Sequence, residues 1–305
     1  MHRRDFLKTT GVMAGGLALT SLIPNLVHAS LTLGNTKIST LSDGTLGLPG
    51  DMVYGHLPQD ELAPILEKYS LDRKRVVPEC NVTLVQSGEN KVLFDVGAGP
   101  NFMPTAGKIL ESLEGTDLSV DDITHVIFTH AHPDHIWGLL DDFDDPVFPN
   151  ATHMIGKTEW EYWMNPETVN SIEPSRQAFA VGAKNRLSAI EDAVSFFKDG
   201  EEILPGIAAH ASFGHTPGHM AFEVRSGSDA AMIVGDSIVN HHVAFERPDW
   251  HSGSDQDPET GAKTRIALLD KITTDKMQLI GFHLPNGGIG RCERKDNSYQ
   301  FISEA

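Results

Sequence analysis

The sequence predicts an α/β fold, built as one domain, from three observations. Short runs rich in valine, isoleucine and phenylalanine alternate with longer stretches of helical periodicity. Histidines and aspartates follow the ends of several of these short runs. The 305 residues contain no repeat of about 20 to 50 residues and no linker rich in proline, glycine or serine. We therefore expect a single domain over residues 30–305.

Residues 1–29 are left out of this domain because they have the pattern of an export signal. Arg3 and Arg4 are followed by Phe-Leu-Lys at 6–8, a mildly apolar stretch, and Val-His-Ala at 27–29, which is a small-residue cleavage pattern. The two arginines resemble a twin-arginine signal peptide. A retained membrane anchor is the alternative, but polar residues and glycines interrupt the stretch. We expect a periplasmic bacterial protein without stable membrane insertion after signal cleavage.

The expected elements of the domain then follow in alternation. Strands are expected, in chain order, over 81–86, 91–96, 125–128, 153–155, 208–212, 221–224, 231–234 and 277–282. Helices are expected over 60–68, 104–113, 175–187 and 258–272. The last helix has the clearest start, with Asp257 as its cap and Pro258 in its first turn.

Composition and charge narrow the class of partner. With 40% hydrophobic and 22% charged residues, the chain has the composition of a globular enzyme. Its formal net charge of −18 disfavours binding to nucleic acid and to anionic membrane surfaces, so a small neutral substrate is the expectation. Cys80 and Cys292 stand far apart, and neither lies in a CxxC pair. We expect two isolated buried thiols, although an oxidising compartment would permit a disulfide.

The segment most informative about chemistry is Thr-His-Ala-His-Pro-Asp-His at 129–135, directly after an expected strand. It places His130, His132, Asp134 and His135 within six residues. Imidazole and carboxylate groups suit zinc and similar divalent ions. A packed core gains little from crowded polar groups that need partners, so a structural role is disfavoured. The pattern predicts one metal ion near the first two histidines and a second near Asp134 and His135.

Further candidate ligands follow the ends of later strands. His219 closes the segment Gly-His-Thr-Pro-Gly-His at 214–219, Asp236 follows the strand at 231–234, and His283 follows the strand at 277–282. His215 lies in the same glycine-rich segment, where we expect it to support the turn that presents His219. The chain has no Gly-x-Ser-x-Gly segment and no cysteine in a nucleophile motif. Metal chemistry is therefore favoured over a covalent mechanism.

In this order the residues resemble the signature of the metallo-β-lactamase superfamily, from an early aspartate, matched by Asp95, to the final histidine. The resemblance spans about residues 81–284. It implies an αββα sandwich, in which two mixed sheets are flanked by helices, and a catalytic domain with two divalent ions, expected to be zinc. It also implies that Asp95 braces the metal loop without binding metal. The implied ligands are His130, His132 and His219 for the first ion, Asp134, His135 and His283 for the second, and Asp236 for both.

The resemblance also implies a reaction. Two ions about 4 Å apart share a bridging water and lower its pKa towards about 7, so that hydroxide attacks the substrate. Asp134 and Asp236 are the expected catalytic carboxylates, and Asp134 would orient the water or pass its proton to the leaving group.

Several segments extend the likeness to the exported methyl parathion hydrolases and their lactonase and aryl-esterase relatives. They include Ser-Asp-Gly at 42–44, Phe-Pro-Asn-Ala at 148–151 and Asp-Gln-Asp-Pro at 255–258. This likeness implies a lactone or aryl ester substrate, phosphotriesters as a side activity, an aromatic pocket with Trp163 and Phe102, and a homodimer. The alternatives are a β-lactamase-type or other periplasmic hydrolase, and a non-catalytic metal-binding accessory protein of a periplasmic oxidation pathway.

Overall fold

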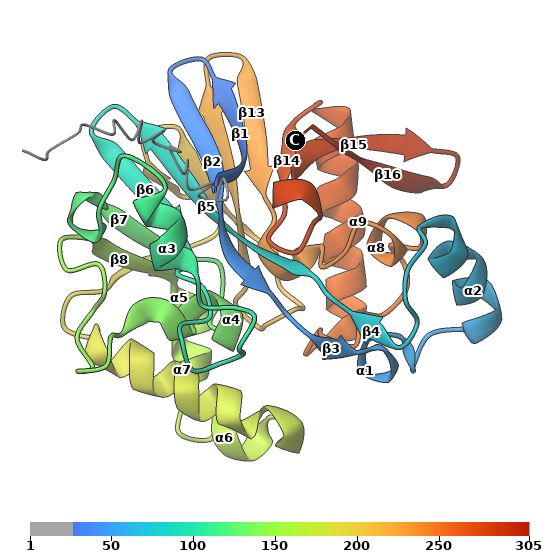
Figure 1. Ribbon diagram of the computed structural model, residues 1–305, viewed down its shortest axis with the longest axis horizontal. Coiled ribbons are helices and arrows are strands. Elements are labelled where there is room, and N and C mark those ends of the chain that lie inside the picture. Colours follow the sequence, from blue (N-terminus) through green and yellow to red (C-terminus); the bar gives the residue numbers. More distant parts are fainter. Residues whose placement is uncertain (1–26, 305) are drawn as a thin grey trace, which may run out of the picture.

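The computed structural model of the protein describes residues 27–304 and folds them into two stacked sheets between helices (Figure 1). The first sheet has the strand order β1-β2-β5-β6-β7-β8-β9. Its strands are β1 (Val27–Leu33), β2 (Thr36–Thr45), β5 (Glu79–Ser87), β6 (Asn90–Phe94), β7 (His125–Phe128), β8 (Thr152–Gly156) and β9 (Ser195–Phe197). The strands from β6 to β9 run parallel, and the others pair antiparallel, so the sheet is mixed.

The second sheet is formed by the C-terminal part of the chain in the order β10 to β16. Its strands are β10 (Glu202–Leu204), β11 (Ile207–Ala211), β12 (Met220–Ser226), β13 (Asp229–Ile233), β14 (Gln278–Ile280), β15 (Ile289–Lys295) and β16 (Ser298–Ser303). Strands β13 and β14 are parallel, and their neighbours are antiparallel. A small separate two-stranded sheet pairs β3 (Leu48–Pro49) with β4 (Arg75–Val76) in antiparallel orientation.

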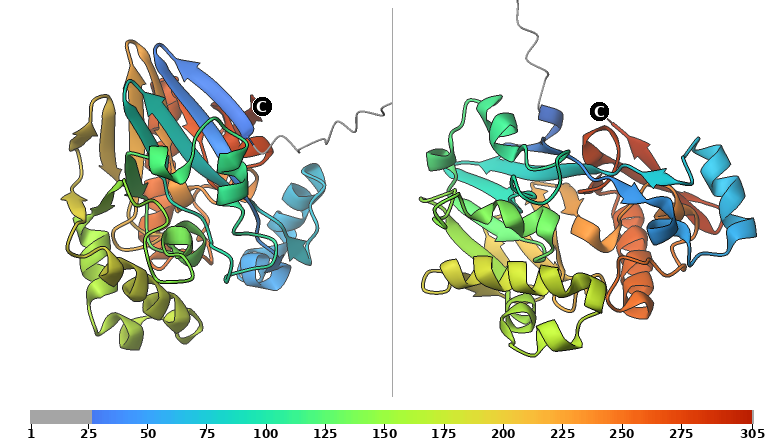
Figure 2. Two further views of the ribbon diagram at one scale, coloured as in Figure 1. Left: turned by 60° about the vertical axis from the view of Figure 1, so that its left-hand side comes forward. Right: turned by 60° about the horizontal axis from the view of Figure 1, so that its bottom comes forward.

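Helices cover both outer faces of the sandwich (Figure 2). The α-helices are α1 (Gly50–Tyr54), α2 (Gln59–Lys68), α3 (Ile109–Glu114), α4 (Pro133–Ile136), α5 (Lys157–Met164), α6 (Thr168–Ser171), α7 (Gln177–Ala189), α8 (Val243–Glu246) and α9 (Pro258–Thr274). Single 3₁₀ turns lie at η1 (Val120–Asp122), η2 (Trp137–Leu139), η3 (Pro174–Arg176), η4 (Gly235–Ser237) and η5 (Asn286–Gly288). In Figure 2 the green and yellow helices lie on one side of the sheets, and the orange helix α9 lies on the other.

The alternation of side chains along the strands produces these layers. In β7, Ile127 points into the core between the sheets, whereas Val126 and Phe128 point to the helices on the first sheet. In β13, Ile233 joins the core between the sheets, and Met232 packs towards α9. Because successive side chains of a strand face opposite sides, each strand contributes to two apolar layers. The αββα sandwich expected from the sequence is confirmed.

The predicted helix over 104–113 forms only from Ile109 onwards. Gly107 has a φ of +80°, and its N–H donates to the carboxylate of the buried Asp43, 3.1 Å away. The same carboxylate accepts the N–H groups of Ala98 and Ile109. This tight loop around Asp43 replaces the first turns of the expected helix, because a residue with positive φ does not continue an α-helix.

Three further outcomes concern the ends of the chain and its thiols. The predicted signal peptide falls almost wholly on residues 1–26, which lie outside the described residues, and strand β1 begins at Val27. No helix within residues 27–304 combines the length and the apolar character that crossing a membrane requires. Cys80 and Cys292 are both buried and unbonded to each other, as predicted.

Candidate metal centre

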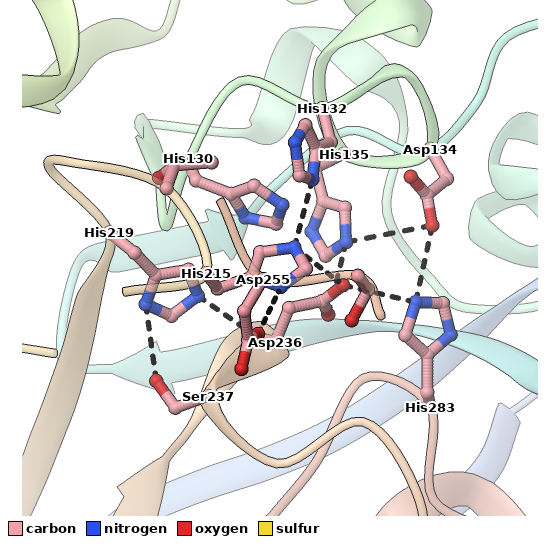
Figure 3. Close-up of polar contacts among 12 residues, drawn as sticks. His130, His132, Asp134, His135, His215, His219, Asp236, Ser237, Asp255 and His283 are labelled. Atoms are coloured by element: carbon pink, nitrogen blue, oxygen red, sulfur yellow. Dashed lines mark hydrogen bonds and ion pairs between the residues drawn. The ribbon is translucent and has the colours of Figure 1, made fainter. Parts of the chain in front are cut away.

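The candidate site lies at one edge of the sandwich, where loops from both sheets converge (Figure 3). The loop and short helix after β7 carry His130, His132, Asp134 and His135. The turn between β11 and β12, the turn η4 after β13 and the loop after β14 carry His215, Asp236 and His283. Strands β7, β13 and β14 each lie in a parallel pair, and their carboxyl ends deliver these side chains to the same edge.

His130, His132 and His215 form the first group of potential ligands. One nitrogen of each ring lies within 4.8 Å of the others, and all three side chains are buried. The Nε2 atom of His215 is 2.8 Å from the Nδ1 atom of His132. Three imidazoles converging on one point with their ring nitrogens match the histidine set of a divalent metal site.

Asp134, His135, Asp236 and His283 form the second group. The Nε2 atom of His283 lies 3.2 Å from Asp134 and 3.4 Å from Asp236, and the Nε2 atom of His135 lies 3.3 Å from Asp236. The Oδ2 atom of Asp236 is also 3.3 Å from the Nε2 atom of His215 in the first group. Asp236 therefore stands between the two groups, where a carboxylate could be shared by two ions.

His219, which the resemblance implies as a ligand of the first ion, lies beside these groups, with 4.9 Å between its ring centroid and that of His130. Its Nε2 atom accepts the backbone N–H of Asp236 at 3.0 Å, and its Nδ1 atom is 2.7 Å from the hydroxyl of Ser212. In Figure 3 the ring extends from its loop towards Asp236, and its Nδ1 atom faces Ser237. His215, from the same turn, has a ring nitrogen in the first group, and its two ring nitrogens likewise have protein partners in Asp255 and His132. The sequence predicts His219 as the ligand and His215 as a support for the turn, whereas the convergence of ring nitrogens favours His215. Metal binding by variants of each histidine decides between them.

The orientation of three of the rings is fixed by an oxygen atom on the side away from the site. The Nδ1 atom of His135 lies 2.8 Å from Asp95, that of His283 lies 2.7 Å from the carbonyl of Glu79, and that of His215 lies 3.2 Å from Asp255. Such contacts select the tautomer that leaves Nε2 free to bind a metal ion. Asp95 also accepts the N–H and hydroxyl of Thr129, so it holds the metal loop as the resemblance implied.

Asp255 is a contributor that motif spacing did not reveal. It is buried with Arg265, whose guanidinium donates to Asp255 at 2.9 Å. The same guanidinium donates to the carbonyl oxygens of Pro248 and Trp250. His215 is therefore connected through a buried ion pair to the segment that follows α8. Asp255 lies in one of the segments that carry the likeness to lactonases and aryl esterases. Nothing in the sequence of that segment indicated a contact with a histidine 40 residues away.

The electrostatics of the two groups differ. Burial, together with the neighbouring imidazoles, holds the pKa of His130 well below its usual range, so the ring is neutral, as a metal ligand must be. Burial also acts to lower the pKa of His135, but the carboxylates of Asp236, Asp134 and Asp95 outweigh it and raise this pKa to about 10. In the absence of a metal ion, the carboxylates of the second group thus favour the protonated form of His135.

Unsatisfied polar atoms support a metal centre. Within the described residues, the Nε2 atoms of His130 and His135 and the Oδ1 atom of Asp236 are buried without a hydrogen-bond partner. Buried polar atoms in native proteins are nearly always satisfied by protein, water or an ion. These three atoms belong to the two converging groups, so the residues fit two divalent cations held by nitrogen and oxygen donors.

A cavity of about 570 Å³ opens directly onto both groups. Its wall includes His132, Asp134, His215, Asp236 and His283 at one end. Most of the remaining wall is apolar and comes from the segments 46–57 and 71–78, the residues around α8, and the side chains of Phe102 and Phe179. This volume and lining are typical of a site for a small organic molecule.

The two aromatic residues expected in the pocket have different positions. Phe102 contributes to the cavity wall. Trp163 is only 1% exposed and packs its ring edge-to-face against His132, with 5.9 Å between ring centroids, so it supports a ligand from behind.

The cavity wall also contains arginines that inspection of the motifs did not suggest. They are Arg75, Arg176, Arg247 and Arg265. Arg176 donates to the carbonyls of Gly253 and Ser254, Arg247 pairs with Glu61 and Asp249, and Arg265 pairs with Asp255. Three of the four are therefore already bonded within the protein.

Comparison with known proteins agrees with this fold and site. The family model described as "Metallo-beta-lactamase superfamily" matches residues 75–276, and the chain belongs to this superfamily. Its structural neighbours are hydrolases and lactonases of that superfamily. AidC, described as a dizinc quorum-quenching lactonase in complex with a product, N-hexanoyl-L-homoserine, is 27% identical with a TM-score of 0.85, covering 92% of this chain and 99% of its own.

Two further relatives extend the comparison. AbOPH, described as a hydrolase in the beta lactamase superfamily, is 27% identical with a TM-score of 0.84, covering 90% of this chain and 97% of its own. Metallo-beta-lactamase domain-containing protein 1 of Xenopus laevis is 30% identical over 215 residues, which are 67% of this chain and 73% of that protein. The protein is therefore a hydrolase of the metallo-beta-lactamase superfamily with two candidate groups of metal ligands.

Proposed function

We propose that the protein uses two zinc ions to hydrolyse a lactone or an aryl ester, with phosphotriesters as a side activity. The observation that carries this proposal is the position of Asp236, which faces both ligand groups at the inner end of a largely apolar cavity. The likeness over nearly the whole chain to AidC, a lactonase, supports the lactone as the first choice.

The two ligand groups would each hold one metal ion. His130, His132 and His215 would hold one ion, Asp134, His135 and His283 the other, and Asp236 would contact both. When bound, such ions lower the pKa of water to generate a nucleophile and polarise a substrate carbonyl.

Asp134 is the residue we assign to proton transfer. It lines the cavity, and its carboxylate lies 3.2 Å from the Nε2 atom of His283. Burial acts to raise the pKa of Asp134, but His135 and His283 lower it below the ordinary value, so the group is ionised at neutral pH. A carboxylate in this position can accept a proton from water and deliver it to the leaving oxygen.

The shape and charge of the molecule favour a neutral substrate. The cavity wall is mainly apolar, and the formal net charge of −18 opposes the approach of anions. A lactone or aryl ester is uncharged until hydrolysis gives a carboxylate, which the same field would help to expel. The arginines in the wall keep a β-lactamase-type activity on anionic substrates as the alternative.

Metal counting combined with parallel assays tests the proposal. The protein is purified, its zinc content is measured, and dihydrocoumarin, N-hexanoyl-homoserine lactone, phenyl acetate, paraoxon and nitrocefin are assayed side by side. We expect two metal ions per chain and the highest kcat/KM for a lactone or aryl ester. Preference for nitrocefin would establish the alternative, and two bound ions without turnover of any substrate would indicate an accessory role.

We also propose that residues 1–29 direct folded protein to the periplasm, on the evidence of their sequence pattern. Fractionation of bacteria producing the full chain should recover it in the periplasm, with the N-terminus of the mature form at or near residue 30. The double variant Arg3→Lys and Arg4→Lys should leave it in the cytoplasm. Equal export of this variant would contradict a twin-arginine route.

A further inference from the structure

Glu159 is a fully buried carboxylate on α5 that accepts four hydrogen bonds. Its Oε1 atom accepts the N–H of Ala131 at 2.9 Å and the indole N–H of Trp163 at 2.6 Å. Its Oε2 atom accepts the hydroxyl of Thr216 at 2.7 Å and the N–H of Gly218 at 3.0 Å. A carboxylate has lone pairs enough for all four donors, whereas a neutral amide has only one oxygen to offer.

Two of these donors lie beside histidines of the first ligand group. Ala131 stands between His130 and His132, and Thr216 directly follows His215. Each of the three rings is therefore within one residue of a hydrogen bond to the same carboxylate. The two loops belong to different sheets, so Glu159 connects them at the place where their side chains must converge.

The contact between α5 and the second loop leaves no spare room. A Cβ atom added to Gly218 would lie 2.1 Å from the backbone nitrogen of Glu159 and 2.5 Å from its Cα atom. The loop can thus approach the helix only because residue 218 is glycine. This close approach brings the N–H of Gly218 within reach of the carboxylate.

The second ligand group has separate supports. Asp95 holds His135 and Thr129, and the carbonyl of Glu79 holds His283. The four hydrogen bonds of Glu159 go to other residues, Ala131, Trp163, Thr216 and Gly218. Disturbing it should therefore act on the first group in preference to the second.

We propose that Glu159 is a positioning residue for the first metal ion, holding the loop of His130 and His132 at a fixed distance from the loop of His215. It contacts neither substrate nor metal. The inference concerns metal affinity and does not depend on which substrate the enzyme hydrolyses.

The variant Glu159→Gln tests this proposal. Glutamine has nearly the size of glutamate, but its NH₂ group cannot accept hydrogen bonds. Whichever way the amide is turned, this group faces two N–H or O–H donors, so one of the two loops loses its hydrogen bond to residue 159. The readouts are the Co²⁺ absorption spectrum and the stepwise release of Co²⁺ to a chelator, without substrate. We expect one equivalent of Co²⁺ to bind about 10- to 100-fold more weakly than in the parent, which is the usual effect of losing a residue that orients metal ligands. The other equivalent should keep its parental affinity.

Glu223→Gln provides a matched control. Glu223 is also a buried glutamate, 2% exposed, but its partners are Arg225, His210 and Lys271, which lie outside both ligand groups and outside the cavity wall. This variant removes a buried charge elsewhere in the fold and should release both Co²⁺ equivalents as the parent does.

Thr216→Val serves as the second variant if Glu159→Gln does not fold. It removes one donor and leaves the carboxylate in place, so we expect weaker binding of the same single equivalent, by a smaller factor than in Glu159→Gln. Parental affinity for both ions in a folded Glu159→Gln or Thr216→Val would overturn the proposal, as would equal weakening of both equivalents. Failure of the proposed function would appear in the substrate assays instead, with Co²⁺ binding intact.

Discussion

The Nε2 atom of His215 and the Nδ1 atom of His132 lie 2.8 Å apart, and their rings meet edge to face at 79°. Together with His130 they define the first ligand group, which His219 does not enter. His215 and His219 thus have different surroundings, although they stand only four residues apart in one turn.

Replacing each of these histidines distinguishes a ligand from a supporting residue. His215→Ala removes a converging nitrogen, so we expect it to lose one metal equivalent. If His215 is the ligand, His219→Ala should keep both ions, although it leaves the buried N–H of Asp236 unsatisfied and should cost about 1 to 3 kcal/mol of stability. Elemental analysis and urea unfolding measure the two effects. Loss of metal from His219→Ala with retention in His215→Ala would restore the ligand set expected from the sequence.

Asp236→Ala should have the largest effect on metal content. The carboxylate lies within 3.4 Å of nitrogens from both groups, so its removal weakens both sites at once. We expect loss of both ions and of turnover, with unchanged far-UV circular dichroism. His132→Ala should release the first ion and likewise abolish turnover. Full activity of either variant would refute the assigned site.

Phe102→Ala tests the cavity as the substrate site. Phe102 lines the wall beside the ligand groups and packs against Trp137 and Phe179. Losing an aromatic contact of about 0.5 to 1.5 kcal/mol should raise KM for an aryl substrate roughly 2- to 10-fold and change kcat little. Phe143→Ala is the matched control, because Phe143 is 85% exposed and lies outside the cavity wall. An equal KM for Phe102→Ala and the parent would place the substrate elsewhere.

His242 should make the stability of the fold sensitive to acid. It is buried, its Nδ1 atom accepts the N–H of Val243 at the start of α8, and burial together with His241 lowers its pKa to about 3. In the unfolded chain its pKa is about 6.5, so the unfolded state binds the proton first. The stability that this neutral ring contributes is therefore complete above about pH 6.5 and is lost as the pH falls towards 3.

His242→Asn isolates this contribution. Asparagine offers an oxygen to the same N–H but does not titrate. Urea unfolding between pH 4.5 and 7.5 should show a shallower loss of stability with acid than in the parent, while His251→Asn, at an exposed histidine, should follow the parent. Identical slopes for the parent and His242→Asn would remove His242 as a cause of acid sensitivity.

The sequence predicted the inner strands and the metal loop because both have strong local signals. Branched and aromatic residues mark β5 to β8, and four potential ligands crowd one loop. Strand β2 gave little signal, since buried Ser39 and Thr40 interrupt its apolar residues. Strand β15 was missed because its exposed face is charged, as is common near the edge of a sheet.

The parts of the site that the sequence did not reveal depend on contacts between distant segments. The close approach of His215 to His132 depends on the path of the turn, which only the packed structure fixes. Trp163 is an aromatic residue of the kind that often lines a pocket, but the structure places it behind His132. Glu159 belongs to no motif, and Asp255 belongs to a segment whose pattern did not indicate a contact with the site. Each reaches a histidine loop only because helices and loops pack around the sheet edge.

The division of the chain between two sheets has a consequence for assembly. The first sheet is complete at residue 197, the second begins at residue 202, and each ligand group draws residues from both. A break in the chain between β9 and β10 would yield two fragments, neither of which carries a whole metal site. Their reassociation would create the sites, so by linkage each bound ion would tighten the union of the fragments. In the intact protein, ions bound at these sites would likewise stabilise the contact between the two sheets.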